Sequence, residues 1–257
     1  MSTSKNSAAK RIDSYHFEVW NHFHKHFDKF IKKRDDESLH QLRVSIKKIV
    51  AVVHFIEYCD SEFDAVQMKS VVKIFRLSGR LRDNRNAHLF CAKFGIQKSV
   101  LKKADSKQED NFKKLKARHK KAGNLDLLRE EMKKHLAPLN TAQLKKYLAE
   151  IMKQVIIAFQ KKMSDKALHN ARKKMKELTY LSKMPGNHSG EIINKSRFEL
   201  LLVLEDVIGD WHDINKFRVK LENQKITKKV FDKVREKEHL LMSETLNLSS
   251  VFKKKQG

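Results

Sequence analysis

Cysteine, proline and glycine are scarce in this sequence, and each scarcity excludes a class of protein. With 7 Gly and 2 Pro among 257 residues, the chain has too few turn formers for a β-sandwich, a barrel or a glycine-rich nucleotide-binding fold. The 2 Cys residues, Cys59 and Cys91, cannot make a disulfide framework and are typical of a reducing cytosol. No apolar run reaches the ~18–20 residues that cross a bilayer, so we expect a cytoplasmic protein without a membrane span.

Negative charge is also in short supply. The chain has 56 Lys and Arg against 31 Asp and Glu, which leaves a formal net charge of +25. So large an excess attracts polyanions such as nucleic acid, anionic lipid or chains of phosphate, and charge alone does not choose among them. Hydrophobic residues make up 40% of the chain, which is enough for a packed core and argues against wholesale disorder.

Apolar residues recur at the three- and four-residue spacing of an amphipathic helix, as in Leu42, Ile46 and Ile49. Capping residues precede two of these stretches, at Asp35–Ser38 and Ser164–Asp165. The sequence therefore predicts an all-α protein. Its helices are expected near residues 9–33, 38–60, 63–93, 107–121, 125–136, 141–163, 166–184, 190–221 and 224–247.

An internal repeat is the most informative feature of the sequence. A shift of 129 residues aligns Phe30, Lys32, Lys33, Asp36, Leu39, His40, Arg43 and Lys47 with Phe159, Lys161, Lys162, Asp165, Leu168, His169, Arg172 and Lys176. A shift of 130 residues then pairs Gly79 with Gly209 and Asp83 with Asp213. The repeat predicts two tandem four-helix bundles, over residues 9–123 and 141–250, joined by a connector at 124–140.

Each copy carries the motif His-x-x-Arg-x-x-x-Lys, and helical geometry places its three side chains on one face. At 100° per residue, His40, Arg43 and Lys47 lie within roughly 60° of one another, about 130° from the apolar stripe of the same helix. Aligned cations repel by ~0.2–0.5 kcal/mol per pair, whereas a charge-assisted hydrogen bond to phosphate contributes ~1.5–3 kcal/mol. One such face is more often a solvated surface, but the matching second copy favours phosphate binding. For His40 and His169 taken singly, a structural role is equally open.

A second cluster of charges follows on the next predicted helix. Arg76, Arg80 and Asp83 are spaced i, i+4 and i+7, and the carboxylate is placed to orient guanidinium groups toward an anion. An ordinary helix ion pair between Arg80 and Asp83 is the alternative. In the second copy few cations precede Gly209 and Asp213, so that copy is expected to be the weaker one.

The ordered motifs resemble the CHAD domain, whose name stands for conserved histidine α-helical domain. Both Leu-His-x-x-Arg segments, at 39–43 and 168–172, are followed some forty residues later by Gly-x-x-x-Asp, and the resemblance covers nearly the whole chain. It implies two bundles related by a pseudo-twofold axis, with basic helix faces lining a central cleft or pore. It also implies binding of inorganic polyphosphate and targeting of proteins to polyphosphate granules. By motif match the contacts fall to His40, Arg43, Lys47, His169, Arg172 and Lys176; we add Arg76 and Arg80, with Asp83 and Asp213 as orienting carboxylates.

Two departures from the family pattern and several absent motifs bear on function. Where the family often has a further basic residue ten positions after the histidine, this chain has Val50 and Thr179, which removes a cation from each row. The sequence has no Glu-x-Glu-x-Lys triphosphatase signature, no P-loop and no zinc finger, so we expect no enzyme, no cofactor and no metal. Two alternatives stay open. One is non-specific nucleic-acid binding through phosphate contacts, and the other is phosphoryl transfer or metal-dependent phosphohydrolysis at His40 or His169.

Overall fold

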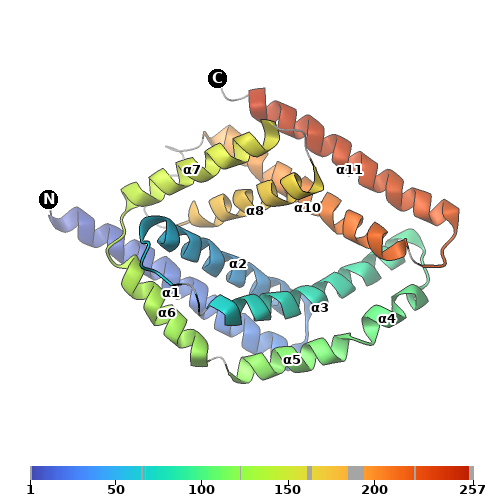
Figure 1. Ribbon diagram of the computed structural model, residues 1–257, viewed down its shortest axis with the longest axis horizontal. Helices are drawn as coiled ribbons and strands as arrows, with labels where there is room; N and C mark the ends of the chain where they lie inside the picture. Colours follow the sequence, from blue (N-terminus) through green and yellow to red (C-terminus); the bar gives the residue numbers. More distant parts are fainter. Residues whose placement is uncertain are drawn as a thin grey trace. The chain divides into compact units, whose positions relative to one another are not determined.

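The computed structural model of the protein describes residues 2–64, 66, 68–121, 123–160, 164–184, 194–222 and 224–254. All regular secondary structure within these residues is helical (Figure 1), so the all-α prediction is confirmed. The helices up to residue 136 are α1 (Ser2–Lys33), α2 (Asp36–Cys59), α3 (Met68–Phe94), the 3₁₀ helix η2 (Lys98–Leu101), α4 (Lys102–Asp105), α5 (Gln108–Lys120) and α6 (Gly123–Leu136). They are followed by α7 (Thr141–Gln160), α8 (Asp165–Leu181), α10 (Lys195–Leu221) and α11 (Lys228–Lys254).

The two caps predicted from the sequence are present at the starts of α2 and α8. Asp35 has an extended backbone, and its carboxylate accepts a hydrogen bond from the Ser38 N–H at 2.7 Å. At the start of α8 the Ser164 hydroxyl oxygen accepts from the Ala167 N–H at 3.2 Å. Each cap satisfies one of the N–H groups that the first turn of a helix leaves without an intrahelical partner.

The turn between α1 and α2 is held by Arg34. Its φ of 52° is the left-handed conformation, which costs a non-glycine residue ~1–2 kcal/mol. The Arg34 guanidinium lies 3.5 Å from the centre of the Phe112 ring and donates two hydrogen bonds to Glu109, at 2.9 and 3.3 Å. These contacts to α5 compensate for the backbone conformation and lower the pKa of Glu109 through the hydrogen bond from Arg34.

The contacts divide the chain into two compact units, which we call the first unit and the second unit. The first unit takes its described residues from 1–83, 106–148 and 180–188, and the second from 84–105, 149–179 and 189–257. Helices α3, α7 and α8 therefore contribute residues to both units. This division by contacts differs from the division by sequence repeat, so the repeat boundaries at 9–123 and 141–250 stay a prediction.

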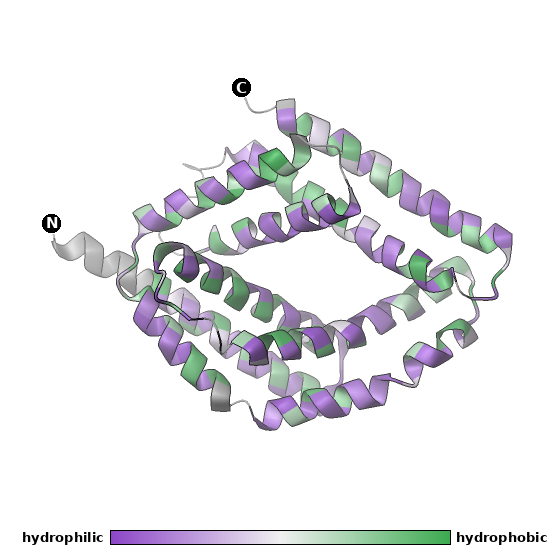
Figure 2. Cartoon of the chain, viewed as in Figure 1, coloured by the Kyte–Doolittle hydropathy of each residue, from purple (hydrophilic) through white to green (hydrophobic). Residues whose placement is uncertain are grey.

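The core of the first unit forms around α1, which packs against α2, α5 and α6. Trp20, Phe23 and Phe27 of α1 and Leu42 and Ile49 of α2 are at most 1% exposed. Burying a side chain of this size contributes ~1.5–3 kcal/mol. Figure 2 shows hydrophobic and hydrophilic residues alternating along the helices as each ribbon turns, which is the pattern of helices that bury one face.

Helix α6 occupies most of the predicted connector and is part of this core. Leu125, Leu128, Met132 and Leu136 are at most 2% exposed, at helical spacing, and α6 contacts both α1 and α2. The segment between the repeats is thus an integral helix of the first unit.

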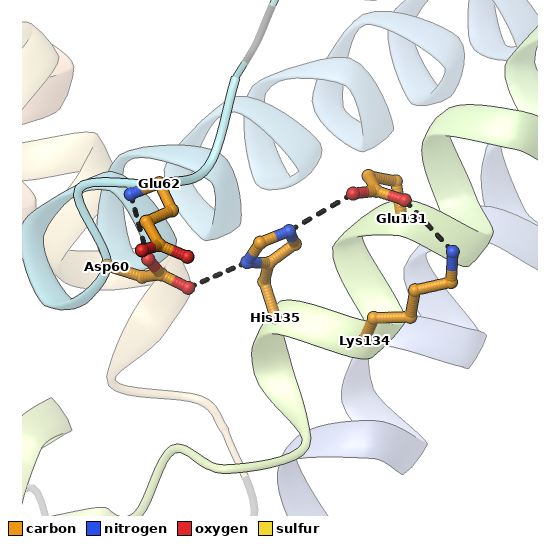
Figure 3. Close-up of polar contacts among 5 residues, drawn as sticks. All are labelled: Asp60, Glu62, Glu131, Lys134 and His135. Carbon is orange, nitrogen blue, oxygen red and sulfur yellow. Dashed lines mark hydrogen bonds and ion pairs between the residues drawn. The ribbon is translucent and has the colours of Figure 1, made fainter.

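A histidine on α6 joins this helix to the end of α2 (Figure 3). His135 Nδ1 lies 2.7 Å from Asp60 Oδ2, and His135 Nε2 lies 3.1 Å from Glu131 Oε1. Asp60 also accepts from the Glu62 N–H at 2.9 Å, and Lys134 donates to Glu131 at 3.2 Å. The hydrogen bond with Asp60 is the main cause that raises the pKa of His135.

The core of the second unit forms where α10 packs against α11. Trp211 and Phe217 of α10 are each 2% exposed, and the Phe217 ring centre lies 5.2 Å from that of Phe90 on α3. Arg218 Nε donates to Glu238 Oε2 at 2.5 Å, which adds a charged contact between α10 and α11. Both units therefore have buried aromatic cores on which their surface residues are positioned.

Candidate anion-binding faces

The five predicted cations of the first copy lie on α2 and α3 within the first unit. We call this set the first face; its members are His40, Arg43, Lys47, Arg76 and Arg80. His40, Arg76 and Arg80 are exposed, and Arg43 and Lys47 are half-buried. Leu42, Ile46 and Ile49 on the same helix are at most 1% exposed, so α2 has a buried apolar stripe and a separate cationic one, as its sequence predicts.

Arg43 connects the two helices of the first face. Its Nη1 donates to the backbone carbonyl of Phe75 at 2.9 Å and lies 3.4 Å from the Ser78 hydroxyl. The guanidinium also lies 4.3 Å from the centre of the Phe75 ring. A Cβ added at Gly79 would lie 2.8 Å from Nη1, so the guanidinium reaches the α3 backbone where glycine leaves room. Arg43 therefore holds α2 against α3 in addition to carrying a positive charge.

Arg172 makes the equivalent contact in the second unit. Its Nε donates to the backbone carbonyl of Glu205 at 3.3 Å, and a Cβ at Gly209 would lie 2.6 Å from Nη2 and 3.1 Å from both Cζ and Nε. Phe75 and Glu205 each stand four residues before their glycine. The repeat seen in the sequence thus has a counterpart in the contacts: arginine, carbonyl and glycine are matched in both copies.

Arg80 and one of the two predicted orienting carboxylates, Asp213, each have an amide neighbour. Arg80 Nη1 lies 3.5 Å from the Oδ1 of Asn111 on α5, and Asn111 is 6% exposed. Asp213 accepts a hydrogen bond from Asn86 Nδ2 at 3.2 Å. Asp83 is half-buried on α3, at the end of that helix's portion in the first unit. The two amides could not be predicted from the sequence, since each lies on a different helix from the residue it contacts.

The second face consists of His169, Arg172 and Lys176, all half-buried on α8 in the second unit. Lys176 Nζ forms an ion pair with Glu205 Oε1 on α10, and Glu205 is only 6% exposed. The Thr179 hydroxyl donates to the Met175 carbonyl at 2.9 Å and lies 3.4 Å from Glu205 Oε2. Glu205 is not part of the predicted site, although the shift of 130 residues aligns it with Phe75 and so marks a difference between the copies.

His169 lies in a cationic environment on the second face. Its ring centre is 4.8 Å from that of His212 on α10, and its buried Nδ1 has no hydrogen-bond partner among the described residues. Burial is the main cause that lowers the pKa of His169 to about 4, and the charges of Lys173, His212, Arg172 and Lys216 act in the same direction. The imidazole is therefore neutral at pH 7 and held in a positive potential, which favours an anion at this place.

In the parts of the chain that the structure describes, no group of three or more His, Cys, Asp or Glu side chains is arranged to hold a metal ion. None of the helices described there combines the length with the apolar run that a bilayer crossing requires. Cys59 and Cys91 are free thiols, and burial raises the pKa of each.

Comparison with known proteins agrees with this architecture. Residues 15–221 match the sequence model of the CHAD domain family. The chain belongs to the CHAD domain family. Its structure is similar to the crystal structure of the CHAD domain from the plant Ricinus communis, with a TM-score of 0.66 and 14% sequence identity over 95% of this chain and 90% of that one. No curated protein sequence matches the chain. The CHAD resemblance of the motifs is thus confirmed, and at this level of identity the structural likeness concerns the fold.

Proposed function

We propose that this CHAD domain binds inorganic polyphosphate through its cationic helix faces, without turnover. The observation that carries the proposal is the duplicated constellation: each unit has a His-x-x-Arg-x-x-x-Lys face whose arginine is held by the same carbonyl and glycine contacts. A net charge of +25 supplies the long-range attraction. Binding of this kind would direct the protein to polyphosphate granules in cells that store the polymer.

The spacing of the charges suits a flexible chain of phosphates. His40 and Lys47 are seven residues apart, which corresponds to about 10 Å along a helix that rises 1.5 Å per residue. A flexible polymer with a charge on every unit can follow such a row, whereas duplex DNA is stiff over ~150 base pairs. The net charge nevertheless favours nucleic-acid binding as the second candidate, in which contacts would be made to phosphates and not to bases.

The test compares polyphosphate binding by two variants. One lacks three positive charges of the first face, and the other lacks three positive charges elsewhere in the same unit. The variant Lys47→Gln, Arg76→Gln, Arg80→Gln leaves Arg43 in place, because Arg43 also holds α2 against α3. The control is Lys113→Gln, Lys116→Gln, Lys120→Gln, three exposed lysines on α5. We expect the first variant to bind long-chain polyphosphate at least ~10-fold more weakly, since each lost phosphate contact is worth ~1.5–3 kcal/mol. We expect the control to lose less than ~2-fold, because exposed charges outside the first face contribute mainly a long-range attraction that salt screens.

Two results, one from this comparison and one from an assay of the wild-type protein, would contradict the proposal. Equal losses in the two variants would mean that polyphosphate responds only to net charge. Release of phosphate from polyphosphate by the wild-type protein with Mg²⁺ or Mn²⁺ would instead favour the phosphohydrolase alternative at His40 or His169. Circular dichroism of both variants checks that the helices are intact.

A further inference from the structure

Glu205 is a buried carboxylate placed directly against a lysine of the second face. Its Oε1 pairs with Lys176, its Oε2 lies 3.4 Å from the Thr179 hydroxyl, and its own backbone carbonyl accepts from Arg172. All these residues lie in the second unit. The position that corresponds to Glu205 in the first copy is Phe75, so the sequence repeat does not reproduce this carboxylate.

We propose that Glu205 is an affinity-determining residue that holds Lys176 away from polyphosphate and so weakens the second face. The inference rests on the proposed function, since it concerns the same ligand. Two negative groups, the Glu205 carboxylate and a phosphate, compete for one ammonium group. The carboxylate has the advantage because it is already in place and forms the contact without losing the freedom of a mobile chain.

The burial of Glu205 makes this competition costly for the phosphate. With 6% of its surface exposed, the carboxylate cannot be hydrated well if Lys176 leaves it, and an unpaired buried charge is strongly unfavourable. If Lys176 keeps the pair and a phosphate approaches as well, two negative charges lie close together where water screens them poorly. Either way, Lys176 contributes less to polyanion binding than its place in the motif predicts.

The remaining groups of the second face are suited to a phosphate. Beside the members of this face, Lys173 and His212 lie near His169: the charges of Lys173 and Arg172 act on its ring, and the His212 ring centre is 4.8 Å away. The Nδ1 of His169 is buried without a hydrogen-bond partner among the described residues. Removal of the Glu205 charge should therefore complete a site whose other members are in position.

The variant Glu205→Gln tests the inference, because it keeps the size of the side chain and removes its charge. We expect polyphosphate affinity to rise about 3- to 10-fold at low salt. We also expect the slope of log K against log salt to steepen by about one, as for one additional neutralised phosphate. The matched control is Asp206→Asn, which removes a charge from the neighbouring, exposed position of α10. It should change the affinity less than ~2-fold and leave the slope unchanged.

A second substitution separates the action of Glu205 through Lys176 from a general effect of its charge. In the double variant Glu205→Gln, Lys176→Met, the gain in affinity and in slope should disappear. Failure of Glu205→Gln to tighten binding would overturn the inference, as would a gain that persists in the double variant. A purely structural ion pair would lower the unfolding midpoint of Glu205→Gln and leave the salt slope of binding as it was.

Lysine acetylation of the wild-type protein supplies a measurement that does not depend on the folding of any variant. Long-chain polyphosphate should slow the acetylation of Lys173, an exposed lysine on the same helix, several-fold and leave the rate at Lys176 nearly unchanged. Equal protection of the two lysines would contradict the inference. Failure of the proposed function looks different: the wild-type protein would not bind polyphosphate, or the first-face variant would bind it normally. If polyphosphate binds through the first face and Glu205→Gln changes nothing, only the role of Glu205 is wrong.

Discussion

Arg43 and Arg172 combine two roles that the sequence does not separate. Each carries the charge that the motif predicts, and each donates a hydrogen bond to a backbone carbonyl of the neighbouring helix. The glycine one turn further on gives the guanidinium its space. The repeated glycine in Gly-x-x-x-Asp is thus explained by close approach of an arginine to a helix.

Substitution of the two glycines by alanine should give different results. Alanine is favoured over glycine within a helix by ~0.8–1 kcal/mol, and this gain is the same at both positions. At Gly79 the new Cβ would press on Nη1 alone at 2.8 Å, whereas at Gly209 it would lie within 3.1 Å of three guanidinium atoms. We expect Gly209→Ala to lower the free energy of unfolding by about 1 kcal/mol more than Gly79→Ala, because a larger part of the guanidinium group must move at Gly209. Urea unfolding followed by circular dichroism measures the two free energies of unfolding. Equal losses in the two variants would contradict the tighter packing of Arg172 against its helix.

At the scale of the helices, the ends are held by contacts between elements that lie far apart in the chain. His135 on α6 contacts Asp60, which directly follows α2, and Glu131 one turn earlier on α6 (Figure 3). The two hydrogen bonds favour the protonated imidazole and lower the pKa values of both carboxylates. This charged group fixes the loop after α2 on α6.

The variant His135→Gln should be destabilised in a manner that depends on pH. The folded pKa of His135 is raised, so its stabilising contribution is fully present below the unfolded value of about 6.5 and is lost as the pH rises through the folded pKa. The contribution from Asp60 and Glu131 is present above their unfolded pKa values and is lost as the pH falls through the lowered ones. The difference in unfolding midpoint between wild type and variant should therefore be largest near about pH 6 and shrink toward about pH 9. A difference that does not vary with pH would contradict the assignment of charge to His135.

The helices could be predicted from the sequence more completely than the contacts between them. Apolar spacing and the caps at Asp35 and Ser164 gave most of the helix positions, because both signals are local. The short helices η2 and α4 were missed, since four residues are too few to show a period. The pairing of Lys176 with Glu205 was missed because it depends on how α8 and α10 pack, which no local pattern records. The Arg80 contact with Asn111 escaped prediction for the same reason.

At the scale of the whole chain, the dominant property is an excess of positive charge that is organised on helices. The net charge of +25 attracts any polyanion, so binding by itself does not distinguish one polyanion from another. Salt will weaken the binding of every such ligand. What the helix faces add is a fixed spacing of cations on rigid elements. A flexible phosphate polymer can adapt to that spacing, while a stiff duplex meets it only in part.

Competition between long-chain polyphosphate and duplex DNA at equal phosphate concentration tests this account most directly. Because polyphosphate can follow the rows of cations, we predict that it displaces labelled duplex DNA from the wild-type protein, and that DNA at the same phosphate concentration fails to displace labelled polyphosphate. The preference for polyphosphate over duplex DNA should become smaller in the triple variant Lys47→Gln, Arg76→Gln, Arg80→Gln. It should stay unchanged in the α5 control variant. Displacement of polyphosphate by duplex DNA would contradict the account and identify the chain as a general binder of polyanions.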